Sequence, residues 1–253
     1  MYNAHFTMEL PVFTVVQNQD ASDQFAPGLA TSGKSHSSDI VSSRIQADPV
    51  GRRWHFACKR AMDISISATA LLILAPLLVV IALVIRLESK GSPLFAQMRW
   101  GKNGKQIRVL KFRSMRTELG DPTGVAQTVR GDPRITKVGA FLRRTNLDEL
   151  PQIWNVLRGD MSLVGPRCHA IGMLAGGMLY EELVVEYHKR HAVRPGLTGL
   201  AQMRGLRGPT DRPAKARARI ASDLFYIENF SVGLDIKILF GTLLSELRGG
   251  QGF

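Results

Sequence analysis

Two adjacent carboxylates, Asp148 and Glu149, stand within a strongly basic chain. Arg143 precedes them, and Arg167 follows at the end of a glycine-containing run. Adjacent acids among arginines suit a site in which one carboxylate binds a metal ion and the other attacks an electrophile that carries phosphates. A purely structural interpretation is also open, because Asn146 stands three residues before Glu149, as in a helix capping box. The spacing alone supports the two interpretations about equally.

The composition narrows the range of partners. The chain has 253 residues and a formal charge of +12, with a sequence pI of about 10.2. This excess of positive charge implies an anionic partner: nucleic acid, an anionic membrane surface or a phosphorylated substrate. The two cysteines, Cys58 and Cys168, follow no disulfide or metal spacing, so we expect a reducing compartment. The histidines form no zinc pattern.

One apolar segment, residues 64–85, is long enough to cross a bilayer core, which takes about 20 residues. Two details argue against simple spanning. Pro76 removes a backbone hydrogen bond near the middle of the segment. Basic residues also flank both ends, as Lys59 and Arg86 do, and the positive-inside rule would keep both flanks in the cytoplasm. A kinked helix that enters and leaves by one face accounts for both details.

The residues alone leave the topology open. A spanning helix still ranks first, because backbone exposed at a kink in lipid is costly. A helix buried in a soluble core is disfavoured, because the segment lacks a polar stripe. The residues before it are rich in Ser, Gln, Asp, Asn and Ala, and we expect a poorly ordered tail over residues 1–55.

From residue 92 onward the pattern predicts a mixed α/β region. Pro151 is tolerable only if its helix starts late, which places Asp148 and Glu149 in the first turn, where anions are favoured. Two carboxylates and an anionic substrate would repel one another there, so we expect Mg²⁺. The loop 194–199 could present backbone N–H groups to a phosphate, although a surface turn is the commoner meaning. The expected strands cover residues 93–98 and 106–112, and the expected helices end at Arg144, run from 146 or 148 to about 157, and cover 178–192, 213–229 and 234–247.

The apolar stripe of the last helix fits either a core or a membrane interface.

Taken together, the motifs of the chain closely resemble the bacterial sugar transferases, or monotopic phosphoglycosyl transferases. The resemblance covers about 190 residues and leaves out the N-terminal tail. The matching motifs, in chain order, are Lys59 to Asp63, Phe95 to Gly101, Lys111 to Met115, Asp132 to Thr136, Leu142 to Gln152, Gly159 to Arg167 and Arg194 to Gln202.

The resemblance implies a fold class and a location. The fold would be mixed α/β and mainly helical, with a re-entrant helix–break–helix over residues 59–88 and a small cytoplasmic catalytic domain over 89–250 that carries amphipathic interfacial helices. Pro76 would form the break, although Ala75 stands where the family often has Ser. The enzyme would sit at the cytoplasmic face of the bacterial inner membrane. Cys168 replaces a second proline of a family motif, and we expect it to act as a small apolar filler.

The resemblance also implies a reaction and its residues. Asp148 would attack the sugar-linked phosphorus of a UDP-sugar and release UMP, while Glu149 would bind Mg²⁺. Polyprenyl phosphate would then take the phosphosugar from the aspartyl intermediate, which initiates exopolysaccharide or other glycoconjugate assembly. The residues expected at substrate phosphates are Arg143, Arg167, Arg194, Gly196, Asp223 and Tyr226.

Two rival functions come from other classes. A membrane-anchored protein that binds nucleic acid or anionic lipid explains the charge and the anchor but not the pair of acids. A membrane phosphohydrolase keeps the anchor and the metal, and it would release free sugar phosphate without a lipid acceptor. Under the family interpretation we expect a membrane and no nucleic acid as partners, with homo-oligomers open. No motif identifies the sugar.

Overall fold

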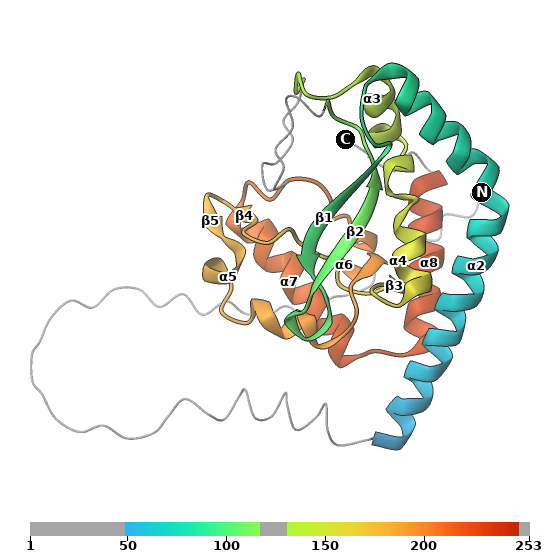
Figure 1. The fold of residues 1–253 in the computed structure, drawn as a ribbon. Coiled ribbons are helices and arrows are strands. Elements are labelled where there is room, and N and C mark those ends of the chain that lie inside the picture. The colour runs from blue at the N-terminus through green and yellow to red at the C-terminus, as the bar shows by residue number, and fades with distance from the viewer. Residues whose placement is uncertain (1–48, 117–130, 248–253) are drawn as a thin grey trace, which may run out of the picture. The chain divides into compact units, whose positions relative to one another are not determined.

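The computed structural model describes residues 49–116 and 131–247 (Figure 1). Most of the predicted tail, residues 1–48, lies outside this range. The described residues form a mixed structure dominated by helices, as predicted. The strands in this part of the chain pair into three two-stranded sheets, β1 with β2, β3 with β6 and β4 with β5.

Helix α2 (Pro49–Glu88) contains the whole apolar segment and begins ten residues before the predicted start at 59. The predicted break at Pro76 does not interrupt it, since α2 continues through Pro76 as one helix of 40 residues. The helix bows so that both ends turn toward the other elements (Figure 1). Its outward side chains are apolar and exposed, among them Leu72 at 79% and Leu87 at 87%. Within the described residues it is the one helix long and apolar enough to cross a membrane.

A hairpin follows α2. Strands β1 (Leu94–Trp100) and β2 (Gln106–Phe112) pair antiparallel, with Leu94 opposite Phe112. The turn between them, with the 3-10 helix η1 (Lys102–Gly104), needs a left-handed backbone at Asn103 and Gly104, which these residue types tolerate. Both predicted strands are confirmed.

The segment after the hairpin carries the two carboxylates. Helix α3 (Lys137–Arg144) is capped at its N-terminus by Thr136, whose hydroxyl accepts from the N–H of Gly139 at 2.9 Å. Next come the 3-10 turn η3 (Leu147–Glu149) and helix α4 (Gln152–Arg158). The carboxylates were predicted in the first turn of the helix but occupy the separate turn η3, because Pro151 has no N–H to continue an α-helical pattern through them.

Asn155 on α4 ties this helix to the hairpin. Its amide donates to the carbonyl oxygen of Arg108 at 2.7 Å and accepts from the N–H of Leu110 at 2.9 Å. Lys111, the next residue of β2, is thereby held beside the turn η3, and the two elements contact each other.

The rest of the chain surrounds a short parallel pair, β3 (Ser162–Val164) and β6 (Gly196–Thr198). The predicted helix over 178–192 is wrong: this stretch holds β5 (Met178–Leu179), α5 (Tyr180–Leu183) and the 3-10 helix η4 (Tyr187–Ala192). Buried contacts of Tyr187 and Arg190 described below override the helical spacing. The remaining elements are β4 (Leu174–Ala175), α6 (Leu200–Met203), α7 (Pro213–Glu228) and α8 (Val232–Leu247).

The main hydrophobic core lies between the hairpin, α4, β3, α7 and α8. It includes Cys168, which is 5% exposed and acts as the expected apolar filler. On α8, Ile238 is buried, and Leu239 of the predicted stripe packs against the core. Four other residues of that stripe, Ile236, Phe240, Leu243 and Leu244, are exposed and do not belong to the core.

Candidate active site

The two carboxylates lie in the turn η3, between α3 and α4 and against β2. Asn146 has a left-handed backbone (φ 55) and its side chain makes no capping hydrogen bond. The capping-box interpretation is therefore wrong, and some other reason must account for two acids at this point.

Glu149 is held by two cations. The Lys111 ammonium on β2 donates to its Oε1 at 2.8 Å, and the Arg167 guanidinium forms an ion pair with the same oxygen. Burial alone would raise the pKa of Glu149, but Arg167 and Lys111 outweigh burial and hold that pKa well below its usual range. Glu149 is therefore ionised. Its second oxygen, Oε2, accepts no hydrogen bond from the described residues.

Asp148 lies in a different environment although it is the next residue. The residue is 7% exposed, and within the described residues its carboxylate makes no hydrogen bond or ion pair. Burial raises its pKa, and the negative charge of Glu149 adds to that rise, while Lys111, Arg143 and Arg167 oppose it. The result is a carboxylate that is surrounded by cations but directly bonded to none of them.

Arg143 reaches this cluster from the last turn of α3. Its guanidinium donates to the Ser114 hydroxyl at 3.4 Å, and burial lowers its pKa against the pull of Asp148. Arg143 and Arg167, the arginines predicted at substrate phosphates, both lie close enough to Asp148 to lower its pKa.

The backbone of Arg167 is held by a buried ion pair between Arg190 and Asp223. Arg190 on η4 donates from Nη2 to the carbonyl oxygen of Arg167 at 2.5 Å and to Asp223 Oδ2 at 2.6 Å. The side chains of Arg190 and Asp223 are 1% and 2% exposed. Asp223, predicted at a substrate phosphate, is bonded to Arg190, and through it to the backbone of Arg167.

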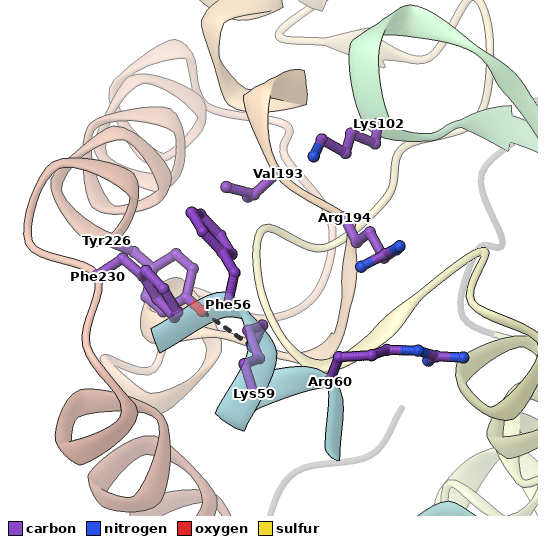
Figure 2. Close-up of a pocket in the computed structure, with 8 residues that line it drawn as sticks. All are labelled: Phe56, Lys59, Arg60, Lys102, Val193, Arg194, Tyr226 and Phe230. Carbon is purple, nitrogen blue, oxygen red and sulfur yellow. Dashed lines mark hydrogen bonds between the residues drawn. The ribbon is translucent and has the colours of Figure 1, made fainter. Parts of the chain in front are cut away.

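The other predicted residues lie apart from the two acids. Tyr226 donates to Asp235 Oδ1 at 2.7 Å and lies within 3.3 Å of the Lys59 ammonium. Arg194 is exposed and donates to the carbonyl oxygen of Gly159 at 2.8 Å. Figure 2 shows Tyr226, Lys59 and Arg194 around a pocket that no residue of the turn η3 lines.

Gly196 serves the packing of the backbone. A Cβ built on it would lie 2.1 Å from the N of Gly165, and a Cβ on Gly165 would lie 2.5 Å from the carbonyl oxygen of Arg194. Only glycine permits β3 and β6 to approach this closely just before Arg167.

The acids fit a magnesium ion by the chemistry of their oxygens. Glu149 Oε2 and the Asp148 carboxylate are oxygen donors that the described residues leave unbonded, and Mg²⁺ uses one or two carboxylates together with substrate phosphates. The described residues contain no group of three or more His, Cys, Asp or Glu side chains that could hold a metal by itself. A substrate would have to complete the coordination.

A model of the bacterial sugar transferase family matches residues 54–249. The chain belongs to this family. It is therefore a transferase, and the rival interpretation as a nucleic-acid or lipid-binding protein without enzymatic activity is wrong.

Three relatives are similar in sequence. The exopolysaccharide production protein PSS of Rhizobium leguminosarum bv. phaseoli is 71% identical over 195 residues, which are 77% of this chain and 98% of that protein. The undecaprenyl-phosphate glucose phosphotransferase of Komagataeibacter xylinus is 48% identical over 83% of the chain. The UDP-glucose:undecaprenyl-phosphate glucose-1-phosphate transferase of Escherichia coli K12 is 50% identical over 73% of it. The chain spans only 39% of the length of each of the latter two.

Two residues of the site were not among the predicted ones, Lys111 and Arg190. Lys111 belongs to the family-like motif 111–115, and that motif was a usable signal for it. Arg190 belongs to the basic run 188–191, and such a run is usually a solvent-exposed face. Only its buried ion pair with Asp223, which the sequence does not reveal, distinguishes Arg190 from an exposed basic residue.

Proposed function

We propose that this protein transfers a hexose 1-phosphate from a UDP-sugar to undecaprenyl phosphate and thereby initiates exopolysaccharide assembly. The activities named for the Komagataeibacter and Escherichia relatives support this reaction, and the name of the Rhizobium relative supports its place in exopolysaccharide production. UDP-glucose is the first donor to test.

The observation that carries the proposal is the contrast between the neighbouring acids. Glu149 is fixed and ionised by Lys111 and Arg167, whereas Asp148 is bonded to none of the described residues. A pair of acids whose pKa values are pushed in opposite directions is typical of a site that assigns them different roles. A free carboxylate among cations suits a nucleophile toward phosphorus, because the cations attract the anionic electrophile.

In the first step an Asp148 oxygen forms a bond to the sugar-linked phosphorus, the bridging P–O bond of the diphosphate breaks, and UMP leaves with that electron pair. In the second step an oxygen of undecaprenyl phosphate bonds to the same phosphorus and displaces the Asp148 carboxylate. The product is undecaprenyl-diphosphosugar. One nucleophile can thus serve a soluble donor and a lipid acceptor in turn.

The roles of the other residues follow from their placement. Arg143, Arg167 and Lys111 supply positive charge where phosphoryl oxygens would lie, and charge on a transferring phosphoryl group is the main thing such a site must stabilise. Glu149 Oε2 would hold Mg²⁺, which when bound would neutralise diphosphate charge and leave Asp148 for the attack on phosphorus.

The order of substrates tests the intermediate. Enzyme in detergent, with Mg²⁺ and UDP-glucose alone, should release UMP up to about one equivalent and then stop. Undecaprenyl phosphate should restart turnover with ping-pong kinetics.

Other mechanisms would give a different time course of UMP release in the same experiment. Direct transfer releases no UMP until both substrates are present, and a hydrolase continues without the acceptor. The absence of early UMP, with a donor shown to be active in full turnover, would remove Asp148 as the nucleophile.

The placement of α2 supports a re-entrant topology on the cytoplasmic face of the bacterial inner membrane. Near its start, Asp63 accepts from the Ser162 hydroxyl at 3.1 Å and from the N–H of Leu163 at 2.9 Å. Near its end, Ile81 and Ile85 pack on Phe112 and Leu142. Since both ends of the apolar helix contact one domain, both belong on one side of the membrane. The exposed stripe of α8 suits the membrane interface.

Cysteine labelling tests this topology. Single cysteines at Arg53 and Lys90, in a Cys58→Ser background, should both react with an impermeant reagent from the cytoplasmic side. Replacing Pro76 with Leu should favour a straight spanning helix and move the residue 53 label to the far side in part of the molecules. Labelling of the two flanks from opposite sides in the unmutated protein would refute the re-entrant arrangement.

A further inference from the structure

A pocket opens beside the first turns of α2 (Figure 2). We call it the foot pocket, and the lining residues used below are Phe56, Lys59, Arg60, Lys102, Arg194 and Phe230. None of the residues that line it is acidic, and none belongs to the turn η3. The reaction proposed above leaves this pocket without a role.

Three positive charges of the foot pocket are not neutralised by a carboxylate. Lys59 forms a buried ion pair with Asp235 at 2.6 Å. In contrast, Arg60, Lys102 and Arg194 form no ion pair with any described carboxylate. The pocket therefore carries an excess of positive charge that an anion could complement.

The two guanidinium groups are held in place by neutral carbonyl groups. Arg60 donates to the carbonyl oxygens of Val156 and Leu157 at 2.7 and 2.8 Å, in the last turn of α4. Arg194 donates through Nε to Gly159 at the end of the same helix, which leaves both of its Nη atoms without a partner in the described residues. These contacts fix two cations close together without cancelling their charge.

Aromatic rings form the other side of the pocket. Phe56 is 41% exposed and stacks on Phe230 with ring centroids 4.7 Å apart. Trp54, on the same helix, is 70% exposed. Exposed aromatic residues beside cations at the end of an apolar helix are typical of the headgroup layer of a membrane.

We propose that the foot pocket binds the phosphate of an anionic phospholipid headgroup. Arg194 and Lys102 contact the phosphate, and Phe56 packs against the glycerol and the first acyl carbons. A ligand with an anionic head and an apolar body matches both sides of the pocket, and the start of the apolar helix places the pocket next to such lipids. This lipid anchors the protein and is not the acceptor of the reaction.

Lipid retention tests the proposal independently of catalysis. The full chain is reconstituted in nanodiscs with equal amounts of phosphatidylglycerol and phosphatidylcholine, and the lipid retained on release is counted by native mass spectrometry. The unmutated protein should retain one phosphatidylglycerol in preference to phosphatidylcholine. The variant Lys102→Gln/Arg194→Gln should retain it at least about tenfold less, since each Lys or Arg near anionic lipid contributes appreciably to binding.

Two controls separate the pocket from general charge and from folding. Lys215→Gln/Arg217→Gln removes the same two residue types from α7, outside the pocket, and should retain lipid as the unmutated protein does. The charge-conserving Lys102→Arg/Arg194→Lys should retain most of it. Equal lipid loss in the α7 variant, or no preference for phosphatidylglycerol in the unmutated protein, overturns the proposal.

Inorganic phosphate distinguishes a lipid from a free anion. Millimolar phosphate added before release should not displace the retained phosphatidylglycerol, because it lacks the apolar body that contacts Phe56. Displacement by phosphate would overturn the assignment to a lipid and identify the pocket as a site for a free phosphate group. Neither result changes the UMP experiment, so the two proposals can fail separately.

Discussion

The turn η3 and the start of α2 are two clusters of buried charge that treat their carboxylates differently. At the start of α2, Lys59 donates to one oxygen of Asp235 on α8 and Tyr226 donates to the other, and the Asp235 side chain is 0% exposed. In η3, Asp148 is bonded to none of the described residues and Glu149 uses one oxygen. A cluster whose hydrogen-bonding capacity is filled holds the fold together. A cluster with unused oxygens, 22% exposed at the Glu149 side chain, keeps its capacity for a ligand.

The largest effect is expected at Asp148. Asp148→Asn keeps the volume but removes the nucleophile, so turnover should fall at least about a thousandfold, or ~4 kcal/mol of barrier. Thermal unfolding in detergent should stay unchanged, because no hydrogen bond to described residues is lost. The exposed Asp211→Asn serves as the matched control and should keep full activity. Retention of more than about a tenth of the turnover would contradict the assigned role.

Lys59→Met should show the opposite pattern. It leaves Asp235 buried with only Tyr226 as a partner, and breaking a buried pair in this way costs about 3–5 kcal/mol of unfolding free energy. The exposed Lys237→Met on the same helix as Asp235 is the control. If Lys59→Met lost no more unfolding free energy than Lys237→Met, the Lys59–Asp235 ion pair would contribute little to stability. Calorimetry or denaturant unfolding in detergent measures the unfolding free energy of both variants.

The pH dependence of the Lys59→Met variant sharpens the same comparison. Burial already raises the pKa of Asp235 despite Lys59, and loss of Lys59 should raise it further. A carboxyl whose folded pKa lies above its unfolded value destabilises the fold as pH rises through that interval. The difference in unfolding free energy between the unmutated protein and the Lys59→Met variant should therefore be smaller at pH 5 than at pH 8.

Glu149→Gln should have an intermediate effect. It leaves Lys111 and Arg167 without their anion and weakens the magnesium site, so we expect a loss of about 10- to 100-fold in activity, or ~1.4–2.8 kcal/mol. The Mg²⁺ concentration for half-maximal UMP release should rise with it. An unchanged Mg²⁺ requirement would mean that Glu149 acts only by holding Arg167 and Lys111.

The smallest effect is expected for Tyr226→Phe. The variant removes one hydroxyl from the filled cluster, which should cost about 1–2 kcal/mol of unfolding free energy. The KM for the UDP-sugar decides whether the hydroxyl also contacts the substrate, as the family resemblance implies. An increase of tenfold or more in KM would place Tyr226 at a substrate phosphate, whereas an unchanged KM would assign it to the fold alone.

The sequence predicted the elements whose pattern is local. A turn that contains Asn103 and Gly104 separates the two strands of the hairpin, and a turn at residues 132–134 precedes α3, so both elements were predicted. The stretch 178–192 was predicted wrongly, because Tyr187 and Arg190 follow helical spacing but are held by His169 and Asp223 from distant parts of the chain. No local pattern reports such partners.

The same distinction applies to the site. The sequence predicted the residues around Asp148 because they are adjacent, and Arg167 because its motif is specific. It also predicted Asp223, but it did not predict the partner Arg190. Arg190 mediates its contact with Arg167, and this pairing bridges residues 33 apart in the chain. The packing between β2, η3 and β3 decides which of the two acids, Asp148 or Glu149, forms ion pairs and with which cations. No local sequence pattern predicts this packing.

The attachment of α2 at both ends limits how this enzyme can be produced. Contacts place α2 in one unit with the residues that follow it, and it covers Asp235, Val164 and Phe112 of that unit. A truncated chain that starts after Glu88 would expose a carboxylate and an apolar surface that normally face the helix. The anchor therefore cannot be trimmed away to make a water-soluble catalytic fragment, and detergents or lipid discs are required for any preparation meant to be folded.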